Sequence, residues 1–291
     1  MQKIHQPAML KETVELLNIQ PNQWYLDATF GRGGHTEAIL KAGGKVLALD
    51  CDQDAIEYGR QALAEPIADT HLILVKSNFI HAEQVMKANH LSRFSGALFD
   101  FGASSDQLLA PNRGFSFQHD SALDMRMDQE LGVSAADLIQ VLSVKQLTNL
   151  FRSAGGENQA GVFAKAIKSA PIPIKTTKQL VELIENLNHH KRGKLHPATK
   201  VFQALRIAVN CELDNIEQTL PKVSKLVEPK GRMVCLSFHQ GEDKIVKSFF
   251  AEITKLGQAQ LLTPKPLTPS NLEVAQNPRS RSTKLRAIEL N

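Results

Sequence analysis

The sequence predicts an α/β protein, in which a largely parallel sheet is covered by helices on both faces and interrupted by an all-helical insertion. Three observations predict this fold. Strand and helix patterns alternate through about the first hundred residues, strand patterns are missing from about residue 109 to 213, and they return before the C-terminus. Such alternation is typical of parallel sheets, because parallel neighbours are usually joined by a helix.

Four short β-rich runs form the first part of the expected sheet. They are Trp24–Phe30, Lys45–Asp50, Leu72–Val75 and Ala97–Phe101. Helical patterns lie between them, for example at His35–Ala42 and Gln53–Ala64. Ligands of parallel sheets bind at the carboxyl ends of the strands. The residues that follow these runs are therefore the first candidates for a binding site.

The expected insertion shows helix starts and apolar stripes. Ser143-x-x-Gln146 and Thr176-x-x-Gln179 match the capping box that begins many helices. The stripes that follow are Leu147, Leu150 and Phe151 in one segment and Leu180, Leu183, Ile184 and Leu187 in another. Strand patterns return at Arg232–Phe238 and Lys284–Leu290. We therefore expect residues 1–108 and 214–291 to form one domain and residues 109–213 to form a second, inserted one.

The composition is that of an ordinary globular protein, with 42% apolar and 22% charged residues among 291. The net charge of +4 permits a polyanionic partner without requiring one. The three cysteines are far apart and form no Cys/His cluster, so neither a metal site nor a disulfide framework is expected. The N-terminus lacks an apolar signal core, and no run is long enough to span a membrane. These features predict a cytoplasmic protein.

A glycine-rich turn follows the first strand pattern. Gly31, Gly33 and Gly34 stand between a strand and a helix, where glycine lets the backbone turn sharply and approach a ligand. The N–H groups at the start of that helix favour an anionic group. The spacing is GxGG, so the GxGxxG pattern of dinucleotide-binding proteins fails at its third glycine. The carboxylate of S-adenosylmethionine (AdoMet) is an alternative occupant of the helix start.

Three further residues follow strand patterns at the same expected edge. Asp50 ends the second run, where a carboxylate is placed to accept both ribose hydroxyls of a nucleoside. Phe79 follows the third run and is placed to lie against an adenine, and Asp100 ends the fourth. The alternative is that the two acids are ordinary strand-end residues and that Phe79 belongs to the core.

Several segments together identify the family. They are Asp27–His35, Asp100–Leu108, Arg113–Phe117, Leu123–Asp128, His196–Thr199, Phe202–Asn210, Ser237–His239 and Asn277–Ser282. Taken together they resemble the bacterial ribosomal RNA cytosine-N4 methyltransferases, which modify a cytidine in the decoding region of 16S rRNA. The resemblance extends almost from end to end of the chain.

The resemblance implies a class I, Rossmann-like AdoMet-dependent methyltransferase domain whose helical insertion helps to hold the substrate. The cofactor contacts that it implies are Gly33, Gly34, His35, Asp50, Phe79, Asp100 and Gln107. It also implies an activity on 16S rRNA within a nearly assembled small ribosomal subunit, and a homodimer.

The chain departs from the family pattern at a few positions. Phe101 and Ala103 replace a Leu and a Val, which is an apolar exchange, and Asn158 replaces a Glu. The larger change is Gln240-Gly241, where the family usually has Ser-Leu. We expect this change to alter the local loop and to leave the cofactor pocket intact.

The residues that act on the substrate are less clearly marked. The Asn/Asp-Pro-Pro-aromatic loop of many amine methyltransferases is absent after Asp100. Asn210, Arg206 and His239 are the candidates: Asn210 for the base edge, Arg206 for a phosphate and His239 for substrate orientation or the released proton. Thr199, Gln203, Arg206 and Asn210 form one polar helical stripe beside an apolar stripe of Phe202, Leu205, Val209 and Leu213. The alternatives are a solvated helix face and a structural histidine.

Aromatic and basic segments offer further contacts with RNA. Phe115 and Phe117 could stack on an extruded base, although a small satellite core is the more common role for such residues. His189–Lys194 and the tail from Arg279 to Arg286 could follow the RNA backbone. The alternative for both basic segments is a solvated loop.

Three other functions remain open from the residues alone. The first is a methyltransferase that acts on DNA or a small molecule, and the second is an NAD-dependent oxidoreductase, which the missing third glycine disfavours. The third is a non-catalytic RNA-binding or assembly factor. Binding of labelled AdoMet distinguishes the oxidoreductase from the others, and methyl transfer distinguishes the assembly factor.

Overall fold

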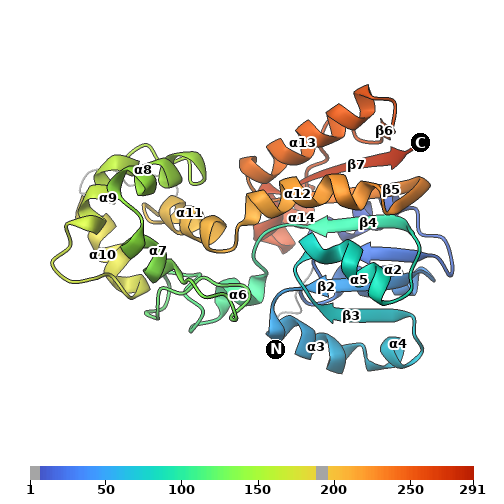
Figure 1. The fold of residues 1–291 in the computed structure, drawn as a ribbon, viewed down its shortest axis with the longest axis horizontal. Coiled ribbons are helices and arrows are strands. Elements are labelled where there is room, and N and C mark those ends of the chain that lie inside the picture. The colour runs from blue at the N-terminus through green and yellow to red at the C-terminus, as the bar shows by residue number, and fades with distance from the viewer. Residues whose placement is uncertain (1–6, 188–195) are drawn as a thin grey trace. The chain divides into compact units, whose positions relative to one another are not determined.

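The computed structural model describes residues 7–187 and 196–291, which divide into two compact units (Figure 1). Unit 1 comprises residues 1–102 and 213–291, and unit 2 comprises residues 103–212. The boundaries expected from the sequence fall after residues 108 and 213, slightly further along the chain. Each unit has its own hydrophobic core, and the two are described separately below.

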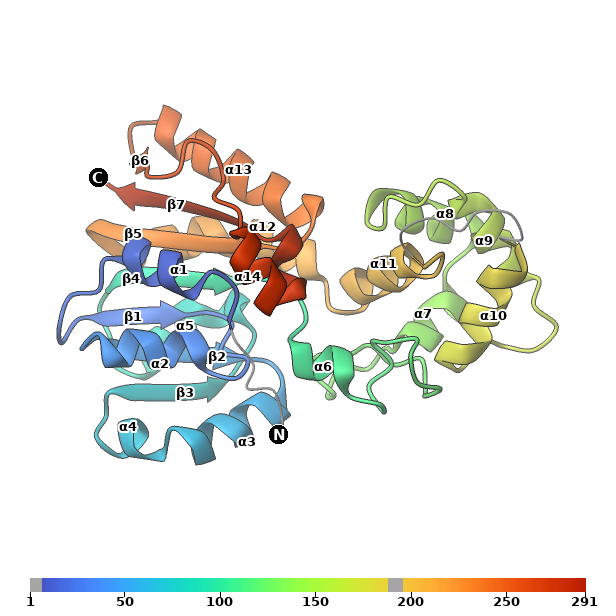
Figure 2. The ribbon, with the colours of Figure 1, turned by 180° about the vertical axis from the view of Figure 1, so that it is seen from behind.

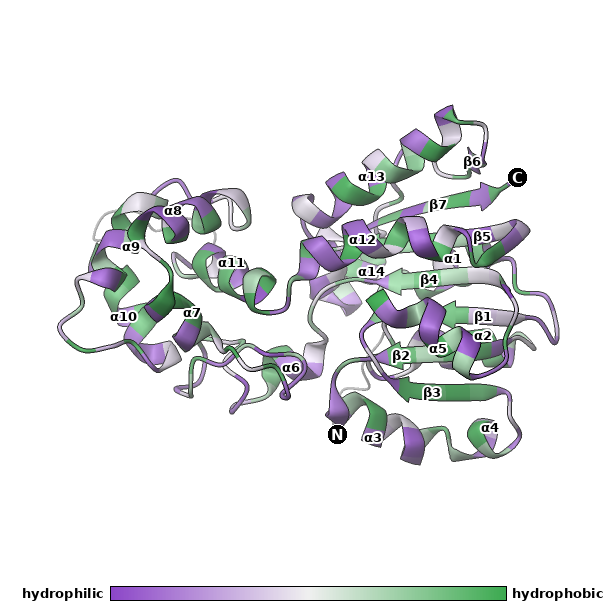
Figure 3. Cartoon of the chain, viewed as in Figure 1, coloured by the Kyte–Doolittle hydropathy of each residue, from purple (hydrophilic) through white to green (hydrophobic). Residues whose placement is uncertain are grey.

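Unit 1 is built around a seven-stranded sheet with the order β3-β2-β1-β4-β5-β7-β6. The strands are β1 (Trp24–Asp27), β2 (Lys45–Asp50), β3 (Leu72–Lys76), β4 (Phe94–Asp100), β5 (Val227–Ser237), β6 (Ala259–Leu261) and β7 (Lys284–Leu290). The first five run parallel, whereas β7 is antiparallel to both of its neighbours, β5 and β6. Figure 3 shows β3 as apolar along most of its length, as expected for a strand that helices cover.

Helices cover both faces of this sheet. One face packs on α5 (Ala82–Ala88), α12 (Glu212–Ser224) and α13 (Gln240–Lys255), which lie in front of or above the strands in Figure 1. The other face packs on α1 (Leu10–Leu17), α2 (Gly34–Lys41) and α3 (Gln53–Ala62), which are in front in Figure 2. Alternate strand residues divide between the two cores, because successive side chains of a strand point to opposite faces: Leu47 belongs to one core and Ala48 to the other.

Shorter elements connect the main ones in unit 1. They are α4 (Ala64–Ala68), the 3-10 helix η1 (Phe79–His81), α14 (Asn271–Gln276) and the 3-10 helix η2 (Pro278–Ser282). The class I α/β architecture predicted from the sequence is thus confirmed, while several strand bounds differ. The first strand ends at Asp27 rather than Phe30, β4 begins at Phe94 rather than Ala97, and β5 begins at Val227 rather than Arg232. The short strand β6 was not predicted.

Unit 2 is helical in the part that the structure describes. Its helices are α6 (Ser105–Leu109), α7 (Ala135–Val141), α8 (Val144–Ser153), α9 (Ala160–Lys168), α10 (Thr177–Leu187) and α11 (Thr199–Val209). The two predicted capping boxes are present, since Ser143 and Gln146 exchange hydrogen bonds, as do Thr176 and Gln179. The two predicted stripes lie on α8 and α10, and Leu187, the last residue of α10, is 39% exposed.

The predicted long helix through Leu213 is interrupted. It ends at Val209, Asn210 caps it, and Cys211 takes the left-handed conformation with φ of 49° before α12 begins at Glu212. The polar stripe therefore stops at Asn210, and Leu213 lies on the next helix. A left-handed conformation is energetically unfavourable for a residue with a β-carbon, because that carbon crowds the following carbonyl oxygen. Such a residue persists only where the surrounding structure holds the turn in place.

No helix within residues 7–187 and 196–291 is long and apolar enough to cross a membrane. The cysteines are free thiols, with Cys235 buried in β5 and Cys211 exposed. Burial raises the pKa of the Cys235 thiol far above its ordinary value, so this side chain behaves as a small apolar group.

Candidate active site

The glycine turn lies at the carboxyl edge of the unit 1 sheet. β1 ends at Asp27, and the chain then turns through Gly31 and Gly33, which have φ of 56° and 74°, into α2. A β-carbon on Gly33 would lie 2.7 Å from the ring of Phe30, and one on Gly34 would collide with Pro7. Glycine is therefore required here both for backbone conformation and for space.

The carboxylate of Asp50 holds this turn from the end of β2. One of its oxygens accepts the N–H of Gly31 at 2.7 Å, and the other accepts the N–H of Asp52 at 2.9 Å. Burial raises the pKa of Asp50 to about 6, although these two hydrogen bonds oppose the shift. A carboxylate so placed beside a glycine turn can accept further hydrogen bonds from a sugar.

Asp27 and Asp100 add two more acids to the same edge. The carboxylate of Asp27 is buried and accepts the hydroxyl of Thr36 at 2.6 Å and the N–H of Thr29 at 3.2 Å. Burial raises its pKa as well. The N–H of Asp100, at the end of β4, donates to the hydroxyl of Thr29 at 2.7 Å. The two threonines thus connect β1, α2 and β4. Neither threonine was predicted from the sequence, although each has a hydroxyl that bonds at the end of a strand.

His35 presents unused polar atoms at this edge. It lies in the first turn of α2 with 5% of its surface exposed, and neither ring nitrogen has a hydrogen-bond partner in the described chain. Its Nε2 lies 3.5 Å from one oxygen of Asp100, whose other oxygen also has no hydrogen-bond partner there. Because buried polar atoms are normally satisfied, this pair is a candidate place for the polar groups of a ligand.

Phe79 stands on η1 after β3, at the edge where the other residues gather. Its ring packs edge-on against Phe99 at 6.0 Å and against Phe101 at 6.2 Å between ring centroids. The side chain is only half-buried. The structure therefore brings together Gly33, Gly34, His35, Asp50, Phe79 and Asp100 within unit 1, whereas Gln107 lies on α6 in unit 2.

Gln107 is buried in a capping box. Its side-chain oxygen accepts the N–H of Ser104 at 2.9 Å, and its own N–H donates to the hydroxyl of Ser104. This arrangement begins α6 directly after the strand-end motif and fixes the direction of the amide.

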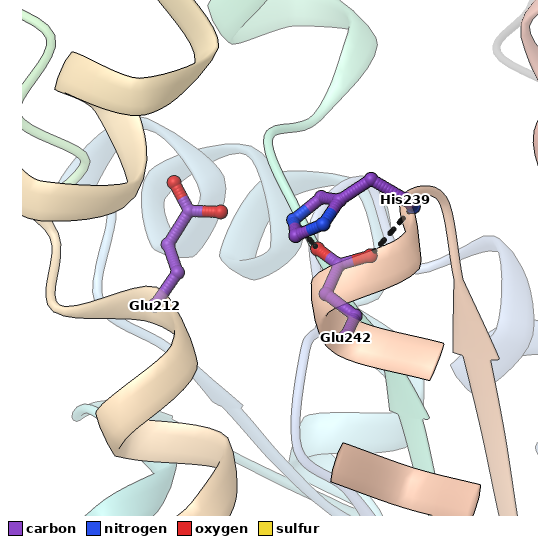
Figure 4. A group of neighbouring side chains, drawn as sticks. All are labelled: Glu212, His239 and Glu242. Atoms are coloured by element: carbon purple, nitrogen blue, oxygen red, sulfur yellow. Dashed lines mark hydrogen bonds and ion pairs between the residues drawn. The ribbon is translucent and has the colours of Figure 1, made fainter. Parts of the chain in front are cut away.

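His239 lies where β5 gives way to α13 (Figure 4). Its Nδ1 accepts the N–H of Gly241 at 3.1 Å, so the neutral ring carries its proton on Nε2. That atom lies 3.1 Å from the fully buried Glu242, without the alignment of a hydrogen bond. The other oxygen of Glu242 accepts the N–H groups of Phe238 and His239. His239 thus caps α13 and is oriented by Glu242.

The Gln240-Gly241 departure has a local explanation in this cap. A β-carbon on Gly241 would lie 3.0 Å from the imidazole of His239, which is tighter than most real contacts. The glycine lets the ring lie directly against the first turn of α13. The change therefore affects how the His239 ring packs against α13.

Asn210 and Arg206 both make contacts within unit 2. The side-chain oxygen of Asn210 accepts the N–H of Met127 at 2.7 Å, and its amide donates to the carbonyls of Met125 and Arg206 at 2.8 and 2.9 Å. Arg206 forms a two-pronged ion pair with Glu212, the third side chain drawn in Figure 4, with both N–O distances 2.8 Å. In this structure both residues brace the end of α11 and the loop it faces.

The aromatic residues of unit 2 are mostly packed inside it. Phe115 is buried in the helical core, while Phe117 stacks on His196 at 4.4 Å between ring centroids. The edge of Phe117 also meets Phe202. The basic segment His189–Lys194 lies outside the described residues.

Comparison with known proteins decides the family. The sequence matches the MraW methylase family over residues 2–291. The chain belongs to the MraW methylase family. It is therefore an AdoMet-dependent methyltransferase, as predicted, and not an NAD-dependent oxidoreductase. A solved structure of a candidate methyltransferase from Streptococcus mutans, in complex with SAH, shares the fold: the TM-score is 0.50 at 14% identity, with 99% of this chain and 100% of that chain covered.

Curated members of this methylase family are similar along almost their whole length. A protein of Rhodopseudomonas palustris (strain BisA53) named Ribosomal RNA small subunit methyltransferase H is 41% identical over 302 residues, covering 98% of this chain and 90% of its own. A protein of the same name from Desulfotalea psychrophila is 42% identical over 296 residues, covering 99% of this chain and 98% of its own.

The residues of unit 1 fit the methyl donor of a MraW methylase. AdoMet carries positive charge on its sulfonium and ammonium groups, which suits an edge that has Asp50 and Asp100 at the ends of β2 and β4. Its ribose hydroxyls can donate to Asp50, and the unsatisfied atoms of His35 and Asp100 offer partners for its polar groups. When bound, AdoMet supplies an electrophilic methyl group.

Proposed function

We propose that this chain transfers the methyl group of AdoMet to N4 of one cytidine in the decoding region of 16S rRNA. The observation that carries the proposal is the identity of about 41% over nearly the full chain to proteins named Ribosomal RNA small subunit methyltransferase H. The motifs quoted above, which resemble those of the cytosine-N4 methyltransferases, support N4 as the acceptor atom. The acidic cofactor edge supports the methyl donor.

The chemistry of the acceptor explains what the protein must provide. The exocyclic amine of cytosine is a weak nucleophile, because its lone pair is delocalised into the ring. The enzyme therefore has to align the amine with the sulfonium methyl. It also has to accept hydrogen bonds from the N–H groups of the amine as the nitrogen rehybridises and these protons become more acidic. The candidates for these tasks remain Asn210, Arg206 and His239.

The geometry of these three candidates suggests how they contribute. Asn210 and Arg206 hold the loop and turn at the end of α11, so we propose that they position the substrate-binding part of unit 2. His239 has its Nδ1 occupied by the N–H of Gly241 and its buried Nε2 3.1 Å from Glu242, so we propose that it shapes the start of α13 as a positioning residue. A role as proton acceptor would require that hydrogen bond to break.

The proposed substrate is the nearly assembled small subunit in the cytoplasm. Purified protein should be incubated with labelled AdoMet and, separately, with small subunits, naked 16S rRNA and duplex DNA, followed by digestion and mass identification of the nucleosides. The ribosomal substrates should come from a strain that lacks the enzyme, since a methylated site cannot accept again. We expect N4-methylcytidine from subunits, little from naked RNA and none from DNA.

Other products would overturn the proposal. Methyl on C5, on a ribose or only on DNA would refute the N4 assignment, and absence of transfer to any nucleic acid with AdoMet still bound would favour an assembly factor. The proposed homodimer is tested by sedimentation of the same preparation, where a monomer mass at micromolar concentration would refute it.

A further inference from the structure

The 3-10 helix η2 lies at the cofactor edge of unit 1. β7 begins at Lys284, which pairs with Ser237 at the carboxyl end of β5, and Leu236 of β5 pairs with Asp100 at the carboxyl end of β4. η2 ends at Ser282, directly before β7. The segment is therefore held at the edge of the sheet where β1, β2 and β4 also end.

η2 is a firmly anchored turn. Ser280 is fully buried, and both its N–H and its hydroxyl donate to the carbonyl of Asn277, at 3.0 and 2.8 Å. Thr283, 1% exposed, donates its N–H to the carbonyl of Ser280 at 2.7 Å. Residues three apart share a face in a 3-10 helix, so Ser280 and Thr283 face inward. Arg279 and Arg281 flank this buried row and are exposed.

The four cations of this tail divide into two kinds. Lys284 and Arg286 are both paired with Asp243, at 2.8 and 2.7 Å, and Arg286 is buried. By contrast, neither Arg279 nor Arg281 has a hydrogen-bond or ion-pair partner among residues 7–187 and 196–291. Lys284 and Arg286 thus neutralise a structural acid, whereas the two arginines of η2 are available for another molecule.

We propose that Arg279 and Arg281 bind two backbone phosphates of the RNA substrate and so hold the strand beside the cofactor edge. This inference rests on the proposed function and adds the contact that positions the strand. A guanidinium suits a phosphate because it offers two parallel N–H donors and stays charged. A rigid turn adds to this, since little backbone freedom is lost when the strand binds.

A phosphate contact predicts a specific pattern of kinetic effects. It should contribute to binding whatever the base sequence and should leave the chemical step unchanged. It should also release counterions, so that the logarithm of affinity falls with the logarithm of salt concentration by about 0.7 per contact for a single strand. Two contacts correspond to about 1.4 in that slope.

The test compares Arg279→Gln/Arg281→Gln with the wild type, using small subunits from a strain that lacks the enzyme. We expect KM for subunits to rise about tenfold near physiological salt, kcat and the Kd for AdoMet to stay unchanged, and the salt slope to fall by about 1.4. Arg279→Lys/Arg281→Lys should retain most of the slope, because it keeps both charges. The thermal midpoint of each variant checks that η2 remains folded.

A charge-matched control is available on α13. Lys247 and Lys255 are exposed, and neither has an ion-pair partner within residues 7–187 and 196–291. Lys255 ends the helix, close in sequence to β6, which pairs with the opposite end of β7. Lys247→Gln/Lys255→Gln removes the same net charge and should leave KM and the slope near the wild-type values.

The outcomes separate this inference from the proposed function. Wild-type values of KM and slope in Arg279→Gln/Arg281→Gln would overturn the phosphate contact, as would an equal loss in the control or a higher KM with an unchanged slope. If the wild type methylates no rRNA at all, the proposed function fails instead. Crosslinking of η2 to an acidic protein of the subunit, and not to RNA, would likewise overturn the inference.

Discussion

Asp50 combines a structural role with a proposed role in binding. Each of its oxygens already accepts one backbone N–H, from Gly31 and from Asp52, and the residue is half-buried. Its pKa of about 6 means that the folded chain favours the protonated form more than the unfolded chain does. The stability that Asp50 contributes through this shift is full below its ordinary pKa of 3.8 and is lost as the pH rises through 6.

Binding of AdoMet should have the opposite dependence on pH. Ribose hydroxyls donate to the carboxylate, so only the deprotonated form of Asp50 offers the full set of acceptors. We expect the affinity for AdoMet to fall by roughly tenfold for each pH unit below about 6 and to level off above it. Calorimetric titration between about pH 5 and 8 measures this dependence.

Asp50→Ala is the control for that measurement. It should weaken AdoMet binding by about 1–3 kcal/mol near neutral pH, since hydrogen bonds to a charged acceptor are lost. It should also remove the change in AdoMet affinity near pH 6. Unchanged affinity in a folded variant, or a step that persists without the carboxylate, would contradict the assignment of Asp50 to the ribose.

The sequence predicted the residues that end strands better than the contacts among them. Asp50 and Asp100 were placed from strand patterns alone, because the end of a parallel strand fixes where its last side chain stands. The raised pKa of Asp50 depends on how deeply neighbouring atoms bury its carboxyl. The ring nitrogens of His35 are unsatisfied because no donor or acceptor of the described chain lies within hydrogen-bond distance and alignment. Neither can be derived from spacing, since both arise from packing between segments far apart in the chain.

Asn210 clamps a strained loop to the end of α11. Met125 is fully buried with φ of 64°, a conformation that is rare for a residue with a β-carbon. Asn210 donates to the carbonyl of this residue and accepts the N–H of Met127. The neighbouring Arg113 donates to the carbonyls of Arg126 and Met127. The loop is thus held on both sides.

Asn210→Ala should therefore lower stability and methylation together. Loss of the amide leaves a buried N–H and carbonyl unsatisfied, which costs about 1–3 kcal/mol for each group. We expect a lower thermal midpoint for the transition of unit 2 and a large loss of kcat, with the Kd for AdoMet nearly unchanged. Thermal unfolding and AdoMet calorimetry on one preparation test both parts.

Gln203→Ala provides the matched change on the same helix. Gln203 is half-buried two turns earlier on α11 and shares no hydrogen bond with the clamped loop. The Gln203→Ala variant should have a thermal midpoint close to that of the wild type. A comparable loss in both variants would show that α11 tolerates no truncation and that Asn210 has no special role.

Two element boundaries illustrate what local patterns leave out. β6 has only three residues, and it is a strand solely because β7 pairs with it. β5 begins before Pro229 and Lys230, which ordinarily indicate a turn; Lys230 has φ of 67°, and the pairing with β4 shifts register there. An irregular strand of this kind is stabilised by its neighbours rather than by its own propensities.

The whole molecule consists of two units with separate cores. The buried cluster of unit 2 draws only on residues within 103–212, and the clusters of unit 1 draw only on the remainder. Of the cofactor contacts implied by the family resemblance, all but Gln107 lie in unit 1. Cofactor binding and substrate recognition can therefore be separated experimentally.

Replacing residues 103–212 with a short flexible linker should spare most AdoMet binding and abolish methylation of small subunits. The free energy of AdoMet binding should weaken by only about 0.5–1.5 kcal/mol, the contribution of one hydrogen bond, because Gln107 is removed. Gln107→Ala in the full chain is the reference, and the two proteins should bind AdoMet with similar affinity. Methylation retained by the shortened protein would show that unit 1 holds the substrate alone.

The interrupted chain of unit 1 also sets an order for its folding during synthesis. β4 lies between β1 and β5, yet β5 is made only after all of unit 2 has been synthesised. Until then β4, an apolar strand, has one unpaired edge, and exposed edges of this kind favour pairing with other chains. Unit 2 is continuous in sequence and can fold in that interval. The edge of β4 therefore stays unpaired for as long as the ribosome takes to synthesise residues 103–212, which separate the two halves of the sheet.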